Sequence, residues 1–85
     1  MGTLNKDFVD YRLDFTMKIL GKNIRSLRLE RGMTQQALAF HIDSSQSVIH
    51  DVETKHSYNP TVFTIKKIAT VLNVPMYELF KPSMG

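Results

Sequence analysis

The 85-residue sequence contains no cysteine. Disulfides, cysteine-ligated zinc and thiol catalysis are therefore excluded, and nothing in the composition points to secretion. Apolar runs are short as well: none approaches the roughly 20 residues that a membrane-spanning helix needs, and the N-terminus lacks the apolar core of a signal peptide. Met1-Gly2 begins like a myristoylation signal, but Lys6 stands where that motif requires Ser or Thr. These absences predict a cytoplasmic protein without a membrane anchor.

Patterns of catalytic residues are also missing. The sequence has no Ser/His/Asp or Cys/His arrangement, no phosphate-cradling glycine loop and no paired carboxylates in a plausible cleft. Its three histidines, His41, His50 and His56, do not stand at spacings that build a zinc site with nearby carboxylates. We therefore expect no enzymatic activity, no bound metal and no cofactor.

What the sequence does contain is helical periodicity. No stretch alternates apolar and polar residues for long enough to make a strand, so the predicted fold class is all-α. A chain of this length makes one domain and buries only about 60% of the surface of its unfolded form. A partner subunit is therefore an expected source of additional stability.

Capping and breaking residues divide the chain into helices. Expected helix starts lie at Thr34, Ser45, Thr61 and Pro75, and expected ends lie at Gly32, Asp43 and Asn73. The segment 55–60, KHSYNP, is expected to be a loop. Apolar residues at helical spacing are expected to face the core; they are Ile24, Leu27, Leu38, Ala39, Ile42, Ile49, Val52, Ile65, Ile68, Ala69 and Leu72.

Residues 1–18 are expected to form an N-terminal extension. Phe8, Tyr11, Phe15 and Ile19 fall at helical spacing there, which predicts either a helix or a loosely attached arm. Residues 19–81 would then make the domain itself, and residues 82–85 a frayed tail.

Basic residues are concentrated in the first part of the chain. Residues 1–33 hold seven Lys or Arg against four acids, whereas residues 34–85 hold four of each. A basic helix beside a neutral remainder suits a polyanion on one side of the molecule. The same charges also suit a solvated helix face, and charge alone favours this second reading.

The stretch TQQALAFHIDSSQSVIHDVE, residues 34–53, predicts two short helices joined by a tight turn. This is the helix-turn-helix pattern, in which the first helix holds the second out from the body of the domain. A protruding helix is slim enough to enter the major groove of B-DNA. The side chains that point away from Ile49 and Val52 on the second helix are Gln46, Ser47, His50, Asp51 and Thr54. All of them form hydrogen bonds, as a surface that reads bases requires.

From Leu20 to Phe80 the chain resembles the phage-repressor helix-turn-helix family, the Cro-like or Xre-like regulators. The resemblance rests on three segments together: IRSLRLERGMTQQALA, SSQSVIHDVE and NPTVFTIKKIATVLNVPMYELF. It implies a five-helix, repressor-like domain, here with an extra N-terminal helical arm. It also implies binding to double-stranded operator DNA, usually as a two-fold homodimer.

Four residues fall on the family's base-reading positions. Gln46 and Ser47 occupy the main positions, unless they merely suit the first turn of a helix; His50 and Asp51 lie one turn further along. His50 is expected to contact a base or a phosphate. Asp51 can accept only from cytosine N4 among major-groove donors. Alternatively it pairs with His50 or Lys55, or discriminates against wrong sequences.

Other matches concern the framework of the site. Arg28 and Glu53 fall on a pair that forms an internal ion pair in the family, although ordinary surface charges are the alternative. Gln35 matches a glutamine that contacts phosphate and braces the first base-reading residue. Three departures stand out, one of which is that the loop KHSYNP is slightly longer than the common pattern. Asp43 replaces a frequent glycine in the turn but tolerates the left-handed conformation, and Lys55 replaces a second glycine after the recognition helix.

Contacts with the DNA backbone are expected around the two short helices, whose N-termini present unpaired N–H groups and positive dipole ends. The candidate residues are Thr34, Gln35, Ser45, Thr54, Lys55, Tyr58, Asn59, Lys22 and Arg25. Such contacts position a protein on DNA without reading its sequence.

The function expected from the sequence is sequence-specific DNA binding by a transcriptional regulator, a repressor acting as a dimer on a palindromic operator. The alternative is a protein-interaction module of the same fold, antitoxin-like or an adaptor, with its partner on the N-terminal extension. Two surfaces are candidates for the dimer interface: the last helix, with Met76, Tyr77 and Phe80, and the N-terminal extension.

Overall fold

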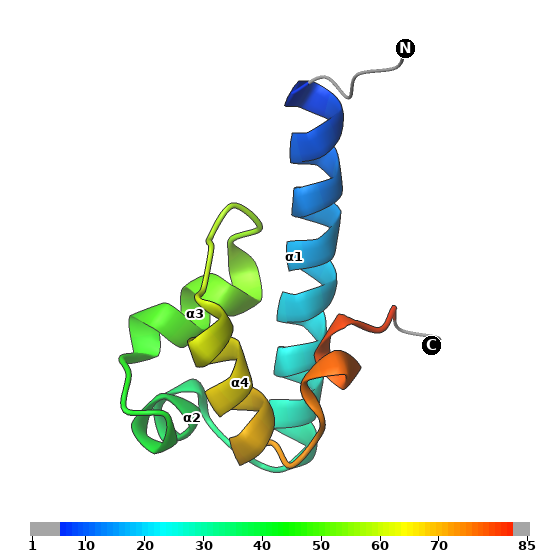
Figure 1. Ribbon diagram of the computed structural model, residues 1–85. Helices are drawn as coiled ribbons and strands as arrows, with labels where there is room; N and C mark the ends of the chain where they lie inside the picture. Colours follow the sequence, from blue (N-terminus) through cyan, green and yellow to red (C-terminus); the bar gives the residue numbers. More distant parts are fainter. Residues whose placement is uncertain (1–5, 83–85) are drawn as a thin grey trace.

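The computed structural model describes the backbone of residues 6–82 and the side chains of residues 13–82. This part of the chain is all-helical and contains no strand, which confirms the predicted fold class (Figure 1). The elements are α1 (Lys6–Glu30), α2 (Gln35–His41), α3 (Gln46–Thr54), α4 (Val62–Val71) and the 3-10 helix η1 (Met76–Phe80). The fifth predicted helix is thus a short 3-10 helix rather than an α-helix.

Helix α1 is a single helix of 25 residues, although the sequence suggested two separate segments. The backbone shows no break near residue 18, and the first half of α1 projects well beyond the other helices (Figure 1). The helix continues through this point because the same face of α1 packs against the core on both sides of it. On that face Leu20 and Ile24 are buried and Met17 is half-buried. The division into an extension and a domain stays a prediction, and the side chains of Phe8 and Tyr11 lie outside the described residues. No helix within residues 6–82 is long and apolar enough to cross a membrane.

The core forms where α1 to α4 and η1 meet. All the residues predicted to face inward are buried except Leu27, which is half-buried against the same cluster. Leu20 from α1 and Leu79 from η1 complete the core. In isolation these short helices would be only marginally stable. Burial of one apolar face of each helix in the shared core stabilises them.

Three helices end in the same way, with one residue in the left-handed region. These residues are Gly32, Asp43 and Asn73, with φ values of 67°, 57° and 60°. After each of them, the next amide N–H donates back to a carbonyl in the last turn of the helix, as Ser44 does to Ala39. This is the Schellman arrangement. Asp43 therefore makes the turn between α2 and α3 in the conformation expected of it.

Helix starts also follow the sequence. The side chains of Thr34, Ser45 and Thr61 each accept from the amide three residues ahead, at 3.0, 3.3 and 3.1 Å. Each N-cap gives an amide of the first turn a side-chain acceptor, which stabilises the helix by about 1 kcal/mol. The predicted caps are confirmed, and they fix where α2, α3 and α4 begin.

Candidate nucleic-acid interface

One face of helix α3 is buried against the rest of the domain, and the opposite face is exposed to solvent. Ile49 and Val52 are buried against α1 and α2, whereas Gln46, Ser47 and His50 are exposed. In Figure 1, α3 lies at the side of the molecule with α2 packed against it. The helix therefore presents a polar surface whose orientation is set by the core beneath it.

Gln35 joins this polar surface from the start of α2. It lines a shallow hollow together with Gln46, Ser47, His50 and Asp51 of α3. Four of the five lining residues are the predicted base-reading set, and the fifth, Gln35, is the glutamine predicted to contact phosphate and brace the first of them. Two elements thus bring amide, hydroxyl, imidazole and carboxylate groups together in one place.

A buried ion pair fixes the base of α3. Arg28 Nε donates to Glu53 Oε2 at 2.7 Å and Arg28 Nη2 to Glu53 Oε1 at 3.0 Å, with the two residues 6% and 8% exposed. Arg28 Nη1 also donates to the carbonyl of Met33, and Gln35 Nε2 donates to Glu53 Oε1 at 3.1 Å. The network ties α1, α2 and α3 together. Because each buried charge has its partners, the arrangement is best understood as specifying geometry.

Asp51 lies in contact with a lysine. Its carboxylate is 3.3 Å from Lys55 Nζ, one helical turn along α3. Of the pairing alternatives left open by the sequence, the structure shows the one with Lys55. The pair reduces the net negative charge that this part of α3 would otherwise present to a polyanion.

The candidate phosphate-contacting hydroxyls divide into two kinds. Those of Thr34 and Ser45 accept from backbone amides as N-caps, and each can still donate its own proton to another acceptor. Thr54 instead donates its proton to the carbonyl of His50 at 2.7 Å. Thr34 and Ser45 are therefore better prepared to donate to a phosphate oxygen than Thr54.

Comparisons with known proteins agree with this geometry. Residues 24–79 match the helix-turn-helix family HTH_3. The chain belongs to this helix-turn-helix family. The match is of the Cro/C1 type, so the resemblance seen in the sequence is confirmed at the family level.

Two curated relatives of this helix-turn-helix chain are transcriptional regulators by name. It is 35% identical over 66 residues to the uncharacterized HTH-type transcriptional regulator y4dJ of Sinorhizobium fredii, covering 78% of this chain and 84% of that protein. It is also 35% identical over 65 residues to the HTH-type transcriptional regulator SutR of Escherichia coli, covering 76% of this chain but only 36% of SutR.

Two solved structures resemble the helix-turn-helix domain closely. The restriction-modification controller protein C.AhdI from Aeromonas hydrophila superposes with a TM-score of 0.70 and 33% identity, covering 75% of this chain and 96% of that one. The hypothetical transcription factor NHTF from Neisseria gives 0.74 and 28% identity, covering 79% and 76%. Chains similar to this one are thus regulators that carry the same fold.

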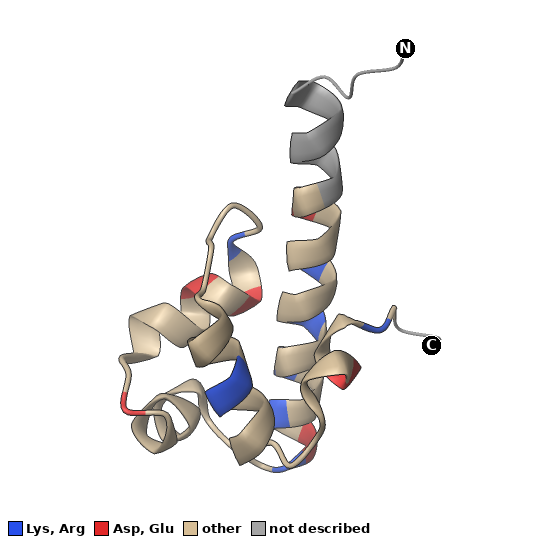
Figure 2. Ribbon diagram, in the orientation of Figure 1, with Lys and Arg blue, Asp and Glu red and all other residues tan. Residues whose placement is uncertain are grey.

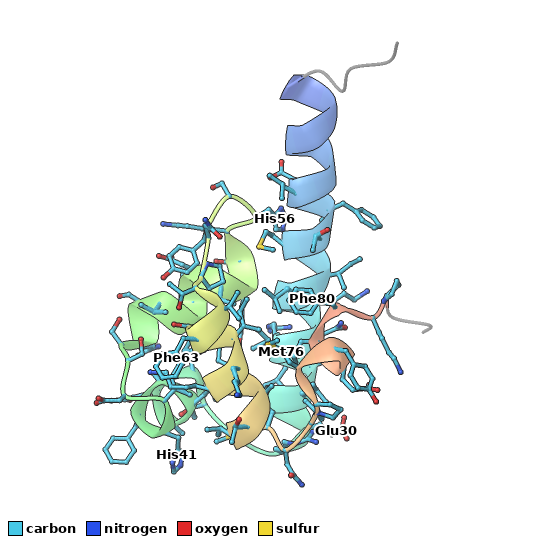
Figure 3. All side chains as sticks on the ribbon, in the orientation of Figure 1. Glu30, His41, His56, Phe63, Met76 and Phe80 are labelled. Atoms are coloured by element: carbon cyan, nitrogen blue, oxygen red, sulfur yellow. The ribbon has the colours of Figure 1, made fainter. Side chains whose placement is uncertain are left out.

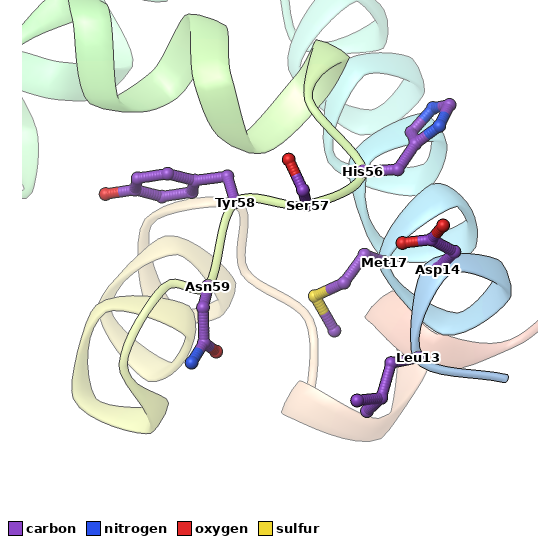
Figure 4. Close-up of a pocket in the computed structure, with 7 residues that line it drawn as sticks. All are labelled: Leu13, Asp14, Met17, His56, Ser57, Tyr58 and Asn59. Carbon is purple, nitrogen blue, oxygen red and sulfur yellow. The ribbon is translucent and has the colours of Figure 1, made fainter. Parts of the chain in front are cut away.

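The loop after α3 stands beside the projecting part of α1. Leu13, Asp14 and Met17 of α1 and residues 56–59 of the loop line a cleft of about 490 Å³ between them (Figure 4). Tyr58, a candidate for backbone contact, is half-buried and packs against the core, whereas Asn59 is exposed. The loop is therefore placed by the helix-turn-helix core on one side and lies against α1 on the other.

Within residues 13–82, whose side chains are described, the basic residues are not gathered into one cluster. Figure 2 shows Lys and Arg spread along the described part of α1. Lys22 and Arg25 are both exposed there. Among the residues whose side chains are described, no group of three or more His, Asp or Glu is placed to hold a metal ion.

Three residues that support the site were not predicted from the sequence. A Cβ on Gly21 would lie 2.5 Å from the carbonyl oxygen of Val52, so glycine is what lets α1 approach α3. Asn23 Nδ2 donates to the carbonyls of Leu79 and Lys81, at 2.9 and 2.7 Å, and so anchors η1.

The third is Lys67, whose Nζ donates to the carbonyl of Ile42 at the end of α2, at 2.9 Å. For Gly21, a glycine inside a helical apolar pattern is a usable signal, because glycine is costly there unless a close contact needs it. For Asn23 and Lys67 the partners are carbonyls distant in sequence, which leave no local signal.

Proposed function

We propose that this protein is a transcriptional repressor of the Xre or Cro-like kind, acting in the cytoplasm, that binds a palindromic operator as a homodimer. The observation that carries the proposal is the polar hollow shared by Gln35 of α2 and the exposed face of α3. The buried pair of Arg28 and Glu53 supports it by holding both helices in one orientation.

In the proposed complex, α3 lies in the major groove. Gln46 and Ser47, at its exposed N-terminal end, read bases, since Gln pairs with adenine N6/N7 and Ser bonds to several base edges. His50, one turn further along, contacts a base or a phosphate. Asp51 reads cytosine N4 or, paired with Lys55, discriminates against sequences that would place another acceptor beside it.

The proposed backbone contacts surround this surface and fix the register of α3 on the duplex. Thr34 and Ser45 donate hydroxyl protons, Gln35 uses the amide atoms not engaged with Glu53, and Asn59 reaches from the loop. Further contributions come from Thr54, Lys55 and Tyr58 around α3 and from Lys22 and Arg25 on α1.

The proposed dimer rests on the surface of η1. Tyr77 is 64% exposed there, whereas Met76 and Phe80 are half-buried against the core and contribute less free surface than the sequence suggested. A two-fold dimer would place two copies of α3 about 34–36 Å apart, one helical turn of DNA, and so require inverted half-sites.

Selection of bound sequences from random duplex DNA tests the proposal. We expect an enriched pseudo-palindrome with half-sites about one helical turn apart. The operator found in this way is then placed over a reporter promoter, where the protein should lower transcription. Absence of any enriched sequence at low salt would contradict DNA reading and favour the interaction-module alternative. An enriched site at which the protein raises reporter transcription would contradict only the proposal that it is a repressor, and not the proposal that it reads DNA.

A further inference from the structure

The most exposed large apolar side chains of the described residues lie on α2 and α4. Phe40 is 78% exposed and Phe63 is 69% exposed. Neither belongs to the hollow over α3. A domain this small gains stability from every apolar group it buries, so exposed phenyl rings of this size usually mark an interface.

The two rings belong to one continuous surface because His41 lies in both hollows that border them. Phe40 and His41 line a hollow with residues at the start of α2, and His41 and Phe63 line a second one with Lys66 and Val71 of α4. The rings of Phe40 and His41 meet edge to face, with centroids 5.7 Å apart. His41 and Phe63 lie toward the same side of the molecule in Figure 3. We call Phe40, His41, Phe63, Lys66 and Val71 the α2–α4 patch.

The charge around the α2–α4 patch has one sign. No carboxylate lines either hollow, whereas Lys66 and Lys67 both line the second. Lys67 is already engaged, because its Nζ donates to the carbonyl of Ile42 and lies 4.9 Å from the centre of the Phe63 ring. Lys66 is exposed and is left as the cation able to meet an incoming group.

This combination favours a protein over a nucleic acid as the occupant. The α2–α4 patch offers two phenyl rings and only one available lysine. It therefore provides far more apolar surface than phosphate-neutralising charge. Phosphate backbones are bound by several cations at once, whereas a peptide segment buries aromatic anchors and pairs a few carboxylates at their rim.

We propose that the α2–α4 patch docks a segment of another protein that carries carboxylates beside aromatic or aliphatic side chains. The patch shares no residue with the hollow formed by Gln35 and the exposed face of α3, so a partner and DNA can be bound together. Thr34 lies at the edge of the first hollow. If Thr34 contacts a phosphate as proposed above, the partner stands next to the DNA backbone.

A selection from a library of random short peptides tests this inference on the full chain. The library is first depleted on the double variant Phe40→Ser, Phe63→Ser, whose helix content and operator binding should match those of the parent because both rings are exposed. Enriched peptides should combine Asp or Glu with Phe, Tyr, Trp or Leu. Either single Phe→Ser change, or Lys66→Glu, should weaken their binding about tenfold or more. Phe15→Ser, an exposed phenylalanine on α1, is the matched control and should bind as the parent does.

Five outcomes would overturn the proposal. The first three are a failure to enrich any peptide, the enrichment of basic peptides, and the enrichment of peptides that the double variant also retains. The double variant could sediment as a smaller species than the parent, which would make the α2–α4 patch a contact between copies of this chain. Duplex DNA could shift the NMR signals of Phe40 and Phe63, which would assign the patch to nucleic acid.

Discussion

Among single residues, Gln46 provides the sharpest test of base reading. Its side chain is exposed at the start of α3 and lines the hollow with Gln35. Replacing it by Ala should cost about 1–3 kcal/mol on the selected operator and relax the preference at one base position. Affinity measured on the operator and on single-base variants of it gives both quantities.

Gln36→Ala is the matched control, because Gln36 is an exposed glutamine on α2 outside that hollow. It should leave the base preference unchanged. If Gln46→Ala weakens binding to every sequence by one common factor, Gln46 contacts the backbone and reads no base.

The ion pair of Arg28 and Glu53 makes a second prediction for single residues. Glu53→Gln leaves the Arg28 charge buried without its counter-ion, which should cost about 3–5 kcal/mol in the free energy of unfolding. Replacing both residues by Met should cost less than the costs of Arg28→Met and Glu53→Met added together, since no charge is then left unpaired. Urea denaturation of the four proteins in this cycle measures the coupling.

The exposed pair of Lys81 and Glu78 is the control for that cycle. Its atoms are as close, at 2.8 Å, but the side chains are largely exposed to solvent. Breaking this pair with Lys81→Met should leave the free energy of unfolding nearly unchanged, because exposed ion pairs contribute little to stability. Equal effects at both pairs would show that burial does not set the energetics of the Arg28–Glu53 pair.

Residues whose partners are local were predictable from the sequence, and those whose partners are distant were not. Thr34, Ser45 and Thr61 cap amides three residues ahead, so their role is visible in a short window. Asn23 binds carbonyls 56 and 58 residues away. Such a contact depends on where η1 packs, which no local pattern specifies. Arg28 and Glu53 were placed together through the family resemblance, since their spacing alone carries no such information.

Among the elements, the contact between α1 and α3 depends on Gly21. A methyl group there would meet the carbonyl oxygens of Val52 and Glu53, at 2.5 and 3.0 Å from the added carbon. Gly21→Ala gains about 0.5–1 kcal/mol of helix propensity but should lose about 1–3 kcal/mol through overpacking. We expect a lower thermal midpoint and weaker operator binding, since α3 must shift. Ser26→Ala, on the exposed side of α1, should not destabilise the protein, and equal behaviour of the two variants would exclude the close contact.

The basic residues of α1 make a prediction about salt dependence. If Lys22 and Arg25 reach phosphates, changing either to Gln should weaken binding to all sequences and lower the slope of log affinity against log salt by about 1. Lys81→Gln, at the end of η1, should leave the slope unchanged. Should the slopes of Lys22→Gln and Arg25→Gln also stay the same, these charges only solvate the helix, as the sequence reading allowed.

The bounds of the long helix α1 could not be predicted from the sequence. The sequence predicts a separate N-terminal extension over residues 1–18, and Gly21, just after it, gives no sign of whether the helix continues, because glycine often interrupts helices. In the structure the same glycine is an interior residue, retained because α3 packs against it. The final element was predicted in position but not in type, since Met76–Phe80 is too short for its sequence to distinguish α from 3-10 geometry.

At the scale of the whole molecule, the shape separates three surfaces. The domain measures 48 × 27 × 19 Å, and its long dimension reflects the projection of α1 (Figure 1). The hollow over α3, the α2–α4 patch and the surface of η1 share no residue. DNA, a protein partner and a second copy can therefore each be tested by substitutions that leave the other two surfaces intact.

The proposed dimer concerns the molecule as a whole. With Tyr77 exposed and Phe80 half-buried, Tyr77 is the position where an introduced charge tests the interface without disturbing the core. Tyr77→Glu should shift sedimentation toward the monomer and weaken operator binding, because a single domain contacts only one half-site. Deletion of residues 1–16 removes the projecting turns of α1 but keeps Met17, Leu20 and the core below them. It should leave both the dimer and operator binding largely intact.

The reverse pattern would be a monomeric truncated chain together with no effect of Tyr77→Glu. That result would make the N-terminal extension the dimerisation element, because only that segment would then carry contacts that the second copy needs.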